Sequence, residues 1–334
     1  MDINKKLTEE LDVAQWQVDA AVNLIDEGNT IPFISRYRKE ATGSLNDEQL
    51  RKLFERLTYL RNLEEKKAQV IKSIEEQGKL TDELRAQIEA AETQVAVDDL
   101  YRPYRPKRRT RATIAKEQGL EPLANIILLQ ETDQNPKEFA KEFVNEEKGV
   151  KTVKDALQGA LDIIAEVISD NADYRQAIRD LPYRLGRLSS TAKKPDVKTV
   201  YDNYYKYEEE MTKIAGHRVL AVNRGEAEKV LTVKIIAPVE LINDYLVRHV
   251  ITKKNPNTTP LLELAVTDSY TRLIAPSIET EIRNMLTERA EEGAITVFCK
   301  NLEQLLMQPP IVGQVVLGWD PAFRTGCKLA VVDG

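Results

Sequence analysis

DEQLRKLFERLTYLRNLEEKKAQVIKSIEEQ (residues 47–77) has the clearest periodic pattern in the chain and predicts one long helix. Its apolar side chains recur at spacings of three and four residues, at Leu50, Phe54, Leu57, Leu60, Leu63, Val70 and Ile74. Ser44 or Asn46 can cap the start of this helix, and Gly78 suits a left-handed C-terminal cap. A chain built around such a segment is expected to be mainly α-helical.

The same spacing predicts helices on both sides of this segment. One helix is expected to run through Leu7 and Ile25 and to end at Gly28. Thr81 can cap a shorter helix that reaches about Thr93, so that residues 47–93 form an antiparallel helical hairpin. Further helices are expected from about Glu121, from Pro136 and from Thr152. A spine helix of roughly 45 Å, at about 1.5 Å per residue, is expected from Pro276 to Leu305.

Composition agrees with a helical protein and excludes several classes. The 334 residues include only 14 glycines and 14 prolines, and 31% of them are charged, which favours long surface helices over a turn-rich β-barrel. No apolar run approaches the roughly 18 residues of a membrane span, and the N-terminus lacks the apolar core of a secretory signal. The cysteines and histidines are too few for a disulfide framework or a closed zinc site. Cys299 and Cys327 are interpreted as small packing residues, and His217 and His249 as packing or hydrogen-bonding residues. We therefore expect a cytoplasmic protein without a cofactor.

The basic segment RPYRPKRRTR (residues 102–111) is the strongest functional signal. It carries six positive charges and no acid, at Arg102, Arg105, Lys107, Arg108, Arg109 and Arg111. The chain as a whole has a formal net charge of −6, so the remaining residues sum to −12. Pro103 and Pro106, each preceded by an arginine, favour an extended backbone. A concentrated cationic segment on an acidic protein creates a local electrostatic field.

Three interpretations of the basic segment remain open. Its cations can contact nucleic-acid phosphates while Tyr101 and Tyr104 stack on unpaired bases, and about five neutralised phosphates would give a salt slope of roughly −3.5 on single strands. It can instead be an internal strap whose cations pair with acidic helices of the same chain, or it can bind a protein partner. A second motif, FISRYRKE (residues 33–40), places Arg36 and Arg38 beside aromatic residues, where a structural role is at least as compatible with the sequence as a binding role.

The central part of the chain is less regular. Residues 183–196 are basic and poor in apolar side chains, so they are expected to be a loose boundary. Their cations are candidate extensions of the basic surface: Arg184, Arg187, Lys193 and Lys194. Four tyrosines follow at helical spacings, which predicts packing between helices: Tyr201, Tyr204, Tyr205 and Tyr207. Residues 230–236 have the β-branched content of a strand.

VVLGWDPAFRTGCKLAVVDG (residues 315–334) predicts a β-hairpin. Two strands alone are at best marginally stable, so residues 313–334 are expected to open a further domain whose remainder is missing. Asp320 ends a strand that is expected to be buried, where a carboxylate needs a metal, a phosphate or hydrogen bonds. It can be the first ligand of a two-metal site, or it can cap the turn by accepting a hydrogen bond from Thr325.

Four segments together resemble the bacterial Tex family of transcription accessory proteins. They are IPFISRYRKEATGSLNDEQL (31–50), DDLYRPYRPKRRTRATIAKEQGLEPLA (98–124), GHRVLAVNRGE (216–226) and VLGWDPAFRTGCKLAVVD (316–333), in the family's order. The resemblance implies an N-terminal helical domain with helix-turn-helix-like parts, a central helical region, and a ribonuclease-H-like domain of the YqgF, or resolvase-like, type. It also implies that much of the family's nucleic-acid binding belongs to a C-terminal RNA-binding module.

Two features depart from the family pattern. Arg102 and Arg105 make the basic segment more cationic than the usual L-Y-L-P-Y-K-P-K-R-R-T-R, and Ala322 stands where the resolvase-like strand usually has glycine. A glycine lets the backbone approach a phosphate closely, and Ala322 restricts that approach. Asp320 matches the first carboxylate of the resolvase fold, and no other active-site residue can be carried over.

The sequence as a whole predicts a non-catalytic scaffold that binds RNA or DNA and assists transcription. The predicted fold is mainly α, a helical bundle with helix-turn-helix-like parts and a long spine helix, followed by the first β-hairpin of a truncated α/β ribonuclease-H-like domain. The expected domains cover residues 1–190, 191–312 and 313–334. The predicted nucleic-acid contacts are Tyr101, Arg102, Tyr104, Arg105, Lys107, Arg108, Arg109, Arg111, Arg36 and Arg38.

Two alternatives to that function stay open, and further partners are expected. The full-length protein can be a metal-dependent, resolvase-like nuclease, with Asp320 as its first carboxylate. The chain can also be a protein-interaction scaffold whose basic segment is internally paired. The transcription or translation machinery is a further expected partner, and no metal ligand set is expected in this chain.

Overall fold

The computed structural model describes residues 2–309, 312–321 and 326–333. These residues are mainly α-helical, as predicted, and they divide into two compact units. Unit 1 comprises Met1–Leu181 and Pro238–Ile278, and unit 2 comprises Pro182–Ala237 and Glu279–Gly334. Both units are therefore discontinuous in sequence, and the continuous domains 1–190, 191–312 and 313–334 stay predictions. Among the described residues, no helix combines the length and the apolar character that crossing a membrane requires.

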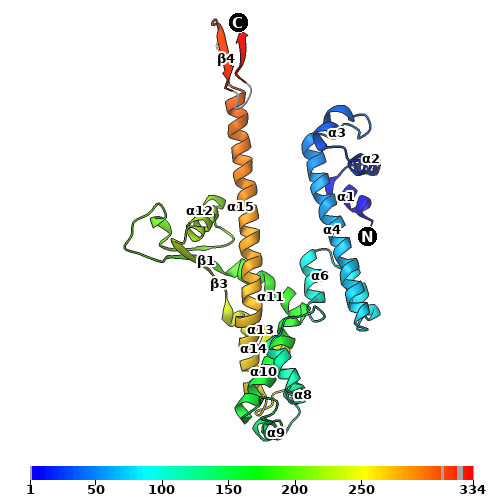
Figure 1. The fold of residues 1–334 in the computed structure, drawn as a ribbon, viewed down its shortest axis with the longest axis vertical. Coiled ribbons are helices and arrows are strands. Elements are labelled where there is room, and N and C mark those ends of the chain that lie inside the picture. Colours follow the sequence, from blue (N-terminus) through cyan, green and yellow to red (C-terminus); the bar gives the residue numbers. More distant parts are fainter. Residues whose placement is uncertain (1, 310–311, 322–325, 334) are drawn as a thin grey trace. The chain divides into compact units, whose positions relative to one another are not determined.

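Unit 1 consists of helices (Figure 1). In chain order they are α1 (Ile3–Leu11), α2 (Gln15–Asp26), α3 (Ile31–Tyr37), α4 (Asp47–Glu76), α5 (Asp82–Ala90), α6 (Gln94–Tyr101), α7 (Arg111–Glu117), α8 (Glu121–Leu129), α9 (Pro136–Glu142), α10 (Val153–Asp170), α13 (Val239–Val250), α14 (Thr259–Asp268) and a π-helical turn, η2 (Ser269–Ile274). Helices α11 (Ala172–Leu185) and α15 (Ala275–Leu306) begin in unit 1 and continue into the sequence of unit 2.

Helix α4 confirms the helix predicted over residues 47–77. The Asn46 side chain accepts a hydrogen bond from the Gln49 backbone N at 2.8 Å, and the Gln49 side chain accepts one from the Asn46 backbone N at 3.0 Å. This capping box satisfies two donors that the helix would otherwise leave unpaired. The leucines of α4 are buried against α1, α2 and α3, and each contributes roughly 1.5–3 kcal/mol. Leu53 takes an inward position, while Phe54, predicted to be inward, is 43% exposed.

The single helix predicted through Leu7 and Ile25 is wrong, because the chain forms α1 and α2 with a break between them. Asp12 adopts a left-handed backbone conformation with φ of 52°, which aspartate tolerates better than most residues. The break lets Leu7 of α1 and Val18 of α2 enter one core. Gly28, with φ of 85°, follows α2 as predicted.

Helix α10 organises the rest of unit 1. Thr152 caps it by accepting a hydrogen bond from the Asp155 backbone N at 3.1 Å, which confirms the predicted start. Helices α7, α8, α9 and α14 and the turn η2 all contact α10. Its buried apolar residues, among them Ile163, Ile164 and Ile168, provide the surface for these contacts.

Unit 2 contains a three-stranded antiparallel sheet in the order β2–β1–β3. The strands are β1 (Arg187–Ala192), β2 (Lys206–Glu210) and β3 (Leu231–Ile236), and helix α12 (Gly216–Ala227) contacts β3. The strand predicted over residues 230–236 is confirmed. The loose conformation predicted over residues 183–196 is wrong, because residues 187–192 form the central strand and pair on both sides, and the domain boundary placed there stays a prediction.

The four tyrosines lie in and around a short turn and strand β2 and not along a helix, so the predicted packing between helices is also wrong. Tyr201 is buried, and Tyr204 ends a short 3₁₀ turn, η1 (Asp202–Tyr204). Tyr207 belongs to β2, and its ring meets the Tyr204 ring edge to face with centroids 5.2 Å apart. A turn followed by a strand places these rings together at a spacing that also fits a helix.

Helix α15 confirms the predicted spine helix. Within unit 2 its residues Ile282, Leu286 and Ala290 are buried. Gly216 of α12 approaches so closely that a Cβ there would lie 3.1 Å from the Ala290 Cα atom. From residue 291 to residue 306 every residue is exposed, and Cys299 is among them. The packing role predicted for Cys299 is therefore wrong.

Strands β4 (Val316–Asp320) and β5 (Lys328–Val332) confirm the predicted hairpin. Asp320 pairs in register with Lys328, and both residues are exposed. The burial predicted for the strand that ends at Asp320 is therefore wrong, as is the packing role of the exposed Cys327. Ala322 and Thr325 lie outside the described residues, so the turn cap predicted for Asp320 stays a prediction.

A buried ion-pair network holds α6 inside unit 1. Asp99 of α6 accepts hydrogen bonds from Arg175 Nε at 3.0 Å and from Arg179 Nη2 at 2.5 Å, both on α11. The Arg175 side chain is 1% exposed and the Asp99 side chain is 8% exposed. Arg175 also donates to the Ser169 carbonyl oxygen at 3.4 Å and to Ser277 Oγ at 2.5 Å. The network therefore connects α6, α10, α11 and the first turn of α15.

We expect Asp99→Ala to lower the free energy of unfolding by about 3–5 kcal/mol, because it leaves the guanidinium of Arg175 buried without its carboxylate. Urea unfolding followed by circular dichroism measures the change. Asp98→Ala is the matched control, since Asp98 is its exposed neighbour and pairs with Lys66 at the surface. That control should shift the free energy by no more than about 1 kcal/mol. Equal shifts in the two variants would contradict the importance of the buried network.

Candidate nucleic-acid interface

The basic segment (residues 102–111) is anchored at both ends. Tyr101 ends α6, and its carbonyl oxygen accepts hydrogen bonds from the backbone N atoms of Tyr104 and Arg105, both at 2.9 Å. At the other end, Thr110 Oγ1 accepts a hydrogen bond from the Thr113 backbone N at 3.0 Å and caps α7. The predicted extended backbone is therefore wrong for residues 101–105, since the fixed φ of Pro103 is also compatible with a helical turn. Arg111 begins a helix.

Two of the six cations, Arg102 and Lys107, pair with an acidic row on α10 that is formed by Asp162, Glu166 and Asp170 at successive spacings of four residues. Lys107 Nζ lies 3.3 Å from the Glu166 carboxylate and donates a hydrogen bond to Asp170. Arg102 Nε lies 3.5 Å from Asp170 Oδ1. The charge of Arg111 acts on Asp162, which also pairs with Arg272 at 3.2 Å. The internal strap that the sequence left open therefore accounts for part of the basic segment.

Burial governs the electrostatics of the acidic row. Burial raises the pKa of Asp170 above its ordinary value, and this effect exceeds the lowering caused by the hydrogen bond and charge of Lys107. Burial likewise raises the pKa of Asp162, against the lowering caused by Arg272 and Arg111. The carboxylates therefore depend on the facing cations to remain charged inside the protein.

Arg111 is exposed at the start of α7 and has no ion pair among the described residues. The remaining three cations, which lie between α6 and α7 and which we call the outward arginines, are Arg105, Arg108 and Arg109, and all three are exposed. Arg109 lies 3.1 Å from Glu117, with side chains 71% and 55% exposed, a geometry that contributes little stability. Within the part of the chain that the structure describes, Arg105 and Arg108 have no ion pair. The outward arginines are therefore accessible to a ligand in the irregular part of the basic segment.

Tyr101 and Tyr104 are held by the protein. Both rings pack against the core cluster that contains Leu63 and Val70. Tyr101 Oη lies 2.9 Å from Ser73 Oγ, and the Tyr104 carbonyl oxygen accepts a hydrogen bond from Gln77 Nε2 at 2.9 Å. Their stacking on bases stays a prediction, and the packing leaves only part of each ring for it.

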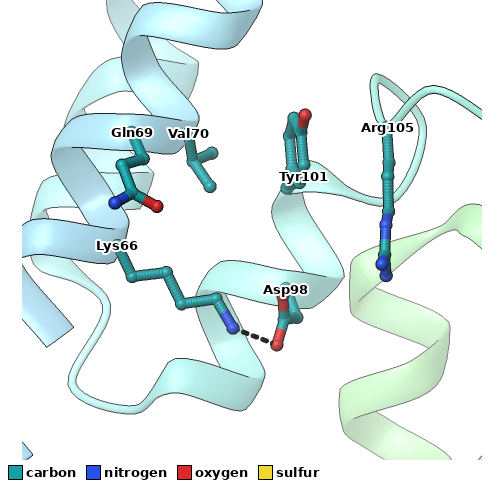
Figure 2. Close-up of a pocket in the computed structure, with 6 residues that line it drawn as sticks. All are labelled: Lys66, Gln69, Val70, Asp98, Tyr101 and Arg105. Atoms are coloured by element: carbon teal, nitrogen blue, oxygen red, sulfur yellow. Dashed lines mark hydrogen bonds and ion pairs between the residues drawn. The ribbon is translucent and has the colours of Figure 1, made fainter. Parts of the chain in front are cut away.

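An open hollow of about 410 Å³ lies beside the first outward arginine (Figure 2). It is lined by Lys66, Gln69 and Val70 from α4, by Asp98 and Tyr101 from α6, and by Arg105 from the turn. Lys66 donates a hydrogen bond to Asp98 across it. The hollow is therefore polar, and a cation borders it on the side of the basic segment.

The remaining predicted residues lie elsewhere. Arg36 and Arg38 are exposed at the C-terminal end of α3, which packs against α2 and α4. The guanidinium carbon of Arg38 lies 5.4 Å from the centroid of the Phe33 ring. Asp320 is exposed on β4, and among residues 2–309, 312–321 and 326–333 no group of three or more His, Cys, Asp or Glu residues could hold a metal ion.

Sequence reasoning missed the acidic row on α10. The signal was present, because acids at positions 162, 166 and 170 recur every four residues within a helix whose other faces are apolar. Such a row on a buried helix requires facing cations, and the basic segment is the part of the chain richest in them.

We expect Lys107→Met to destabilise the protein by about 1–3 kcal/mol at pH 7, because it leaves Asp170 charged, largely buried and short of a donor. Loss of Lys107 raises the pKa of Asp170 further, so the folded variant binds its proton up to a higher pH than the wild type does. The stability deficit should therefore shrink as pH falls toward the ordinary aspartate pKa of about 3.9. Urea unfolding at several pH values measures it.

Arg108→Met is the control for this experiment, because it removes an exposed cation from the same segment. It should change the free energy of unfolding by no more than about 0.5 kcal/mol. A deficit for Lys107→Met that does not vary with pH would refute the pairing with Asp170.

The sequence of this chain matches family models and known proteins. Residues 1–75 match the Tex-like protein N-terminal domain, and residues 131–298 match the Tex central region-like family. The protein YdcI of Bacillus subtilis is 46% identical over 99% of this chain and 46% of its own length. The transcriptional accessory protein Tex of Neisseria gonorrhoeae is 42% identical over 100% of this chain and 44% of its own length.

A more distant relative is the human S1 RNA-binding domain-containing protein 1, which is 31% identical over 99% of this chain and 34% of its own length. The chain thus spans less than half the length of each of these relatives. The basic segment lies between the two matched ranges. The alignment to the Bacillus subtilis protein, which covers 99% of this chain, extends across it. Since the central region match alone extends over half of the chain, the chain belongs to the Tex family.

Proposed function

We propose that this chain binds RNA or DNA as part of a transcription accessory factor, and that the outward arginines contact the phosphates. One observation carries the proposal. The acidic row of α10 pairs with two of the six cations of the basic segment, and the outward arginines remain exposed on a protein of net charge −6. Exposed arginines on an acidic protein form a local anion-binding surface without making the whole molecule cationic.

Phosphate contact suits this surface better than base reading does. The arginines belong to an irregular segment between α6 and α7, and they are spaced at positions 105, 108 and 109 along it. Such side chains can follow a phosphate backbone, whereas base discrimination needs bidentate contacts held at fixed geometry. We therefore expect binding that is strongly salt-dependent and weakly selective for sequence.

The relatives support the class of ligand. One relative is named a transcriptional accessory protein, and another is named for an RNA-binding domain. We extend from these names only the nucleic-acid association. The protein machinery of transcription or translation remains a proposed partner, and Arg36 and Arg38 remain proposed contacts.

The test is a salt titration of fluorescent single-stranded RNA and duplex DNA binding to the whole chain. A variant with Arg105, Arg108 and Arg109 changed to glutamine removes three phosphate contacts. On single strands the slope of log K against log salt should therefore fall in magnitude by about two units. The matched control changes Lys137, Lys148 and Lys154, which are exposed outside the basic segment, to glutamine. It removes the same charge and should keep the wild-type slope.

Equal loss of slope in both variants would show that only net charge matters. No loss in the variant of the outward arginines would refute the proposed contact. A third variant, Arg102→Gln, removes a cation that faces Asp170, and we expect it to affect stability more than the salt slope.

A further inference from the structure

The N-terminal helices carry exposed aromatic rings next to cations, at a place separate from the basic segment. Trp16 is 56% exposed and Tyr37 is 68% exposed. Arg36, Arg38 and Lys39 are exposed beside Tyr37, and Glu40 is the acid among residues 36–44. We call Trp16, Tyr37, Arg36, Arg38 and Lys39 the aromatic–cationic surface.

This surface is built on a rigid loop. Thr42 is fully buried, and its Oγ1 donates a hydrogen bond to the Arg38 carbonyl oxygen at 3.3 Å. The Ser44 backbone N donates to the Lys39 carbonyl oxygen at 2.7 Å. From α2, Gln17 Nε2 donates to the carbonyl oxygens of Thr42 and Gly43 at 3.2 and 3.1 Å. The loop is therefore fixed to α2 by side-chain hydrogen bonds.

Trp16 is positioned by this loop. Gly43 has φ of 60°, and a Cβ atom there would lie 2.3 Å from Trp16 Cη2, so the indole lies directly on the glycine backbone. The six-membered ring of the indole is thus held against Gly43, while more than half of the side chain stays exposed. A ring held in this way loses little conformational freedom when a ligand stacks on it.

Tyr37 is not part of the buried core. Ile34 is the residue of α3 that is fully buried, and Phe33 is partly buried. The Phe33 ring supports both the Tyr37 ring, at a centroid distance of 5.4 Å, and the Arg38 guanidinium, at 5.4 Å from its centroid. Phe33 therefore orders an exposed ring and an exposed cation side by side.

We propose that the aromatic–cationic surface binds single-stranded nucleic acid, with bases stacked on Trp16 and Tyr37 and phosphates on Arg36, Arg38 and Lys39. This inference rests on the proposed function and adds a second contact of a different kind. Charge complementarity selects an anionic polymer, and the exposed rings select one with free π faces. In a duplex the bases are paired and stacked, so their faces are not available to these rings.

The chain supplies its own reporter for this stacking. It has two tryptophans, Trp16 and Trp319, and Trp319 lies on the exposed hairpin strand β4. In a Trp319→Phe background the indole emission comes from Trp16 alone, and a stacked base quenches that emission. The probe is oligouridylate of about 12 nucleotides, within the roughly 4–16 nucleotides of a single-strand site. A duplex of the same length and polyglutamate are compared with it.

We expect the single strand to quench Trp16 and the duplex and polyglutamate to leave it unchanged. Tyr37→Ala, which alters an exposed residue, should raise the Kd for the single strand about fivefold to a hundredfold. Arg36→Gln with Arg38→Gln should weaken binding and reduce the salt slope. The matched control for this pair is Lys137→Gln with Lys154→Gln, and it should behave as the wild type does.

The variant of the outward arginines separates this inference from the proposed function. If that variant binds more weakly but still shows Trp16 quenching, both contacts exist. If it loses salt slope while Tyr37→Ala binds as the wild type does and Trp16 is never quenched, the proposed function stands and the aromatic–cationic surface is refuted. If Trp16 is quenched and the outward arginines have no effect, the surface stands and the proposed contact fails. Quenching by polyglutamate to the same extent would refute a nucleic-acid site here.

Discussion

The buried carboxylate of Asp99 is the constraint from which the position of the basic segment follows. A lone carboxylate in the interior costs several kcal/mol, so α6 must lie where Arg175 and Arg179 of α11 can reach it. The other N–H groups of Arg175 are used by Ser169 and Ser277, so the arginine is also satisfied. With the last turn of α6 held in this way, the chain leaves Tyr101 at a defined point. The next ten residues then run beside α10.

The cations of that segment divide into those that pair with the acidic row on α10 and those that are exposed without such a pair. Acids four residues apart on one helix face repel one another, and burial of Asp162 and Asp170 raises the pKa of both. Arg102 and Lys107 offset this repulsion by pairing with the row, and the charge of Arg111 lowers the pKa of Asp162. The outward arginines do not pair with the acidic row. Under the proposed function, a structural role and a binding role share one ten-residue segment and belong to different side chains within it.

Local signals in the sequence were sufficient for the long elements. The leucine spacing and the Asn46 cap predict α4, Thr152 predicts the start of α10, and the apolar runs around Asp320 predict the hairpin of β4 and β5. Weaker signals failed where tertiary contacts decide. Strand β1 has the sequence RLSSTA, whose short polar pattern becomes a strand only because β2 and β3 pair with it.

The sequence predicted which residues form the candidate site, but it did not predict how their side chains are arranged. A run of six cations stands out in any reading of the sequence, but which of them face α10 depends on contacts between residues more than fifty positions apart. An extended segment would alternate its side chains strictly between two sides, whereas the turn at residues 101–105 and the helix that starts at Arg111 distribute them differently. The predicted packing roles of Cys299 and Cys327 failed for a related reason, since an apolar stripe in sequence does not establish that this chain covers it.

Two contacts of different physical origin would give the protein a binding behaviour that neither gives alone. Attraction between the outward arginines and phosphates weakens steeply with salt, whereas stacking on Trp16 and Tyr37 removes ring surface from water and depends little on salt. A strand long enough to reach both contacts binds the second one as an intramolecular step, so its affinity exceeds that of either contact. A strand too short to do so meets each contact separately. Affinity should therefore depend on strand length most strongly at low salt, where both contacts operate, and lose much of that dependence at high salt, where stacking dominates.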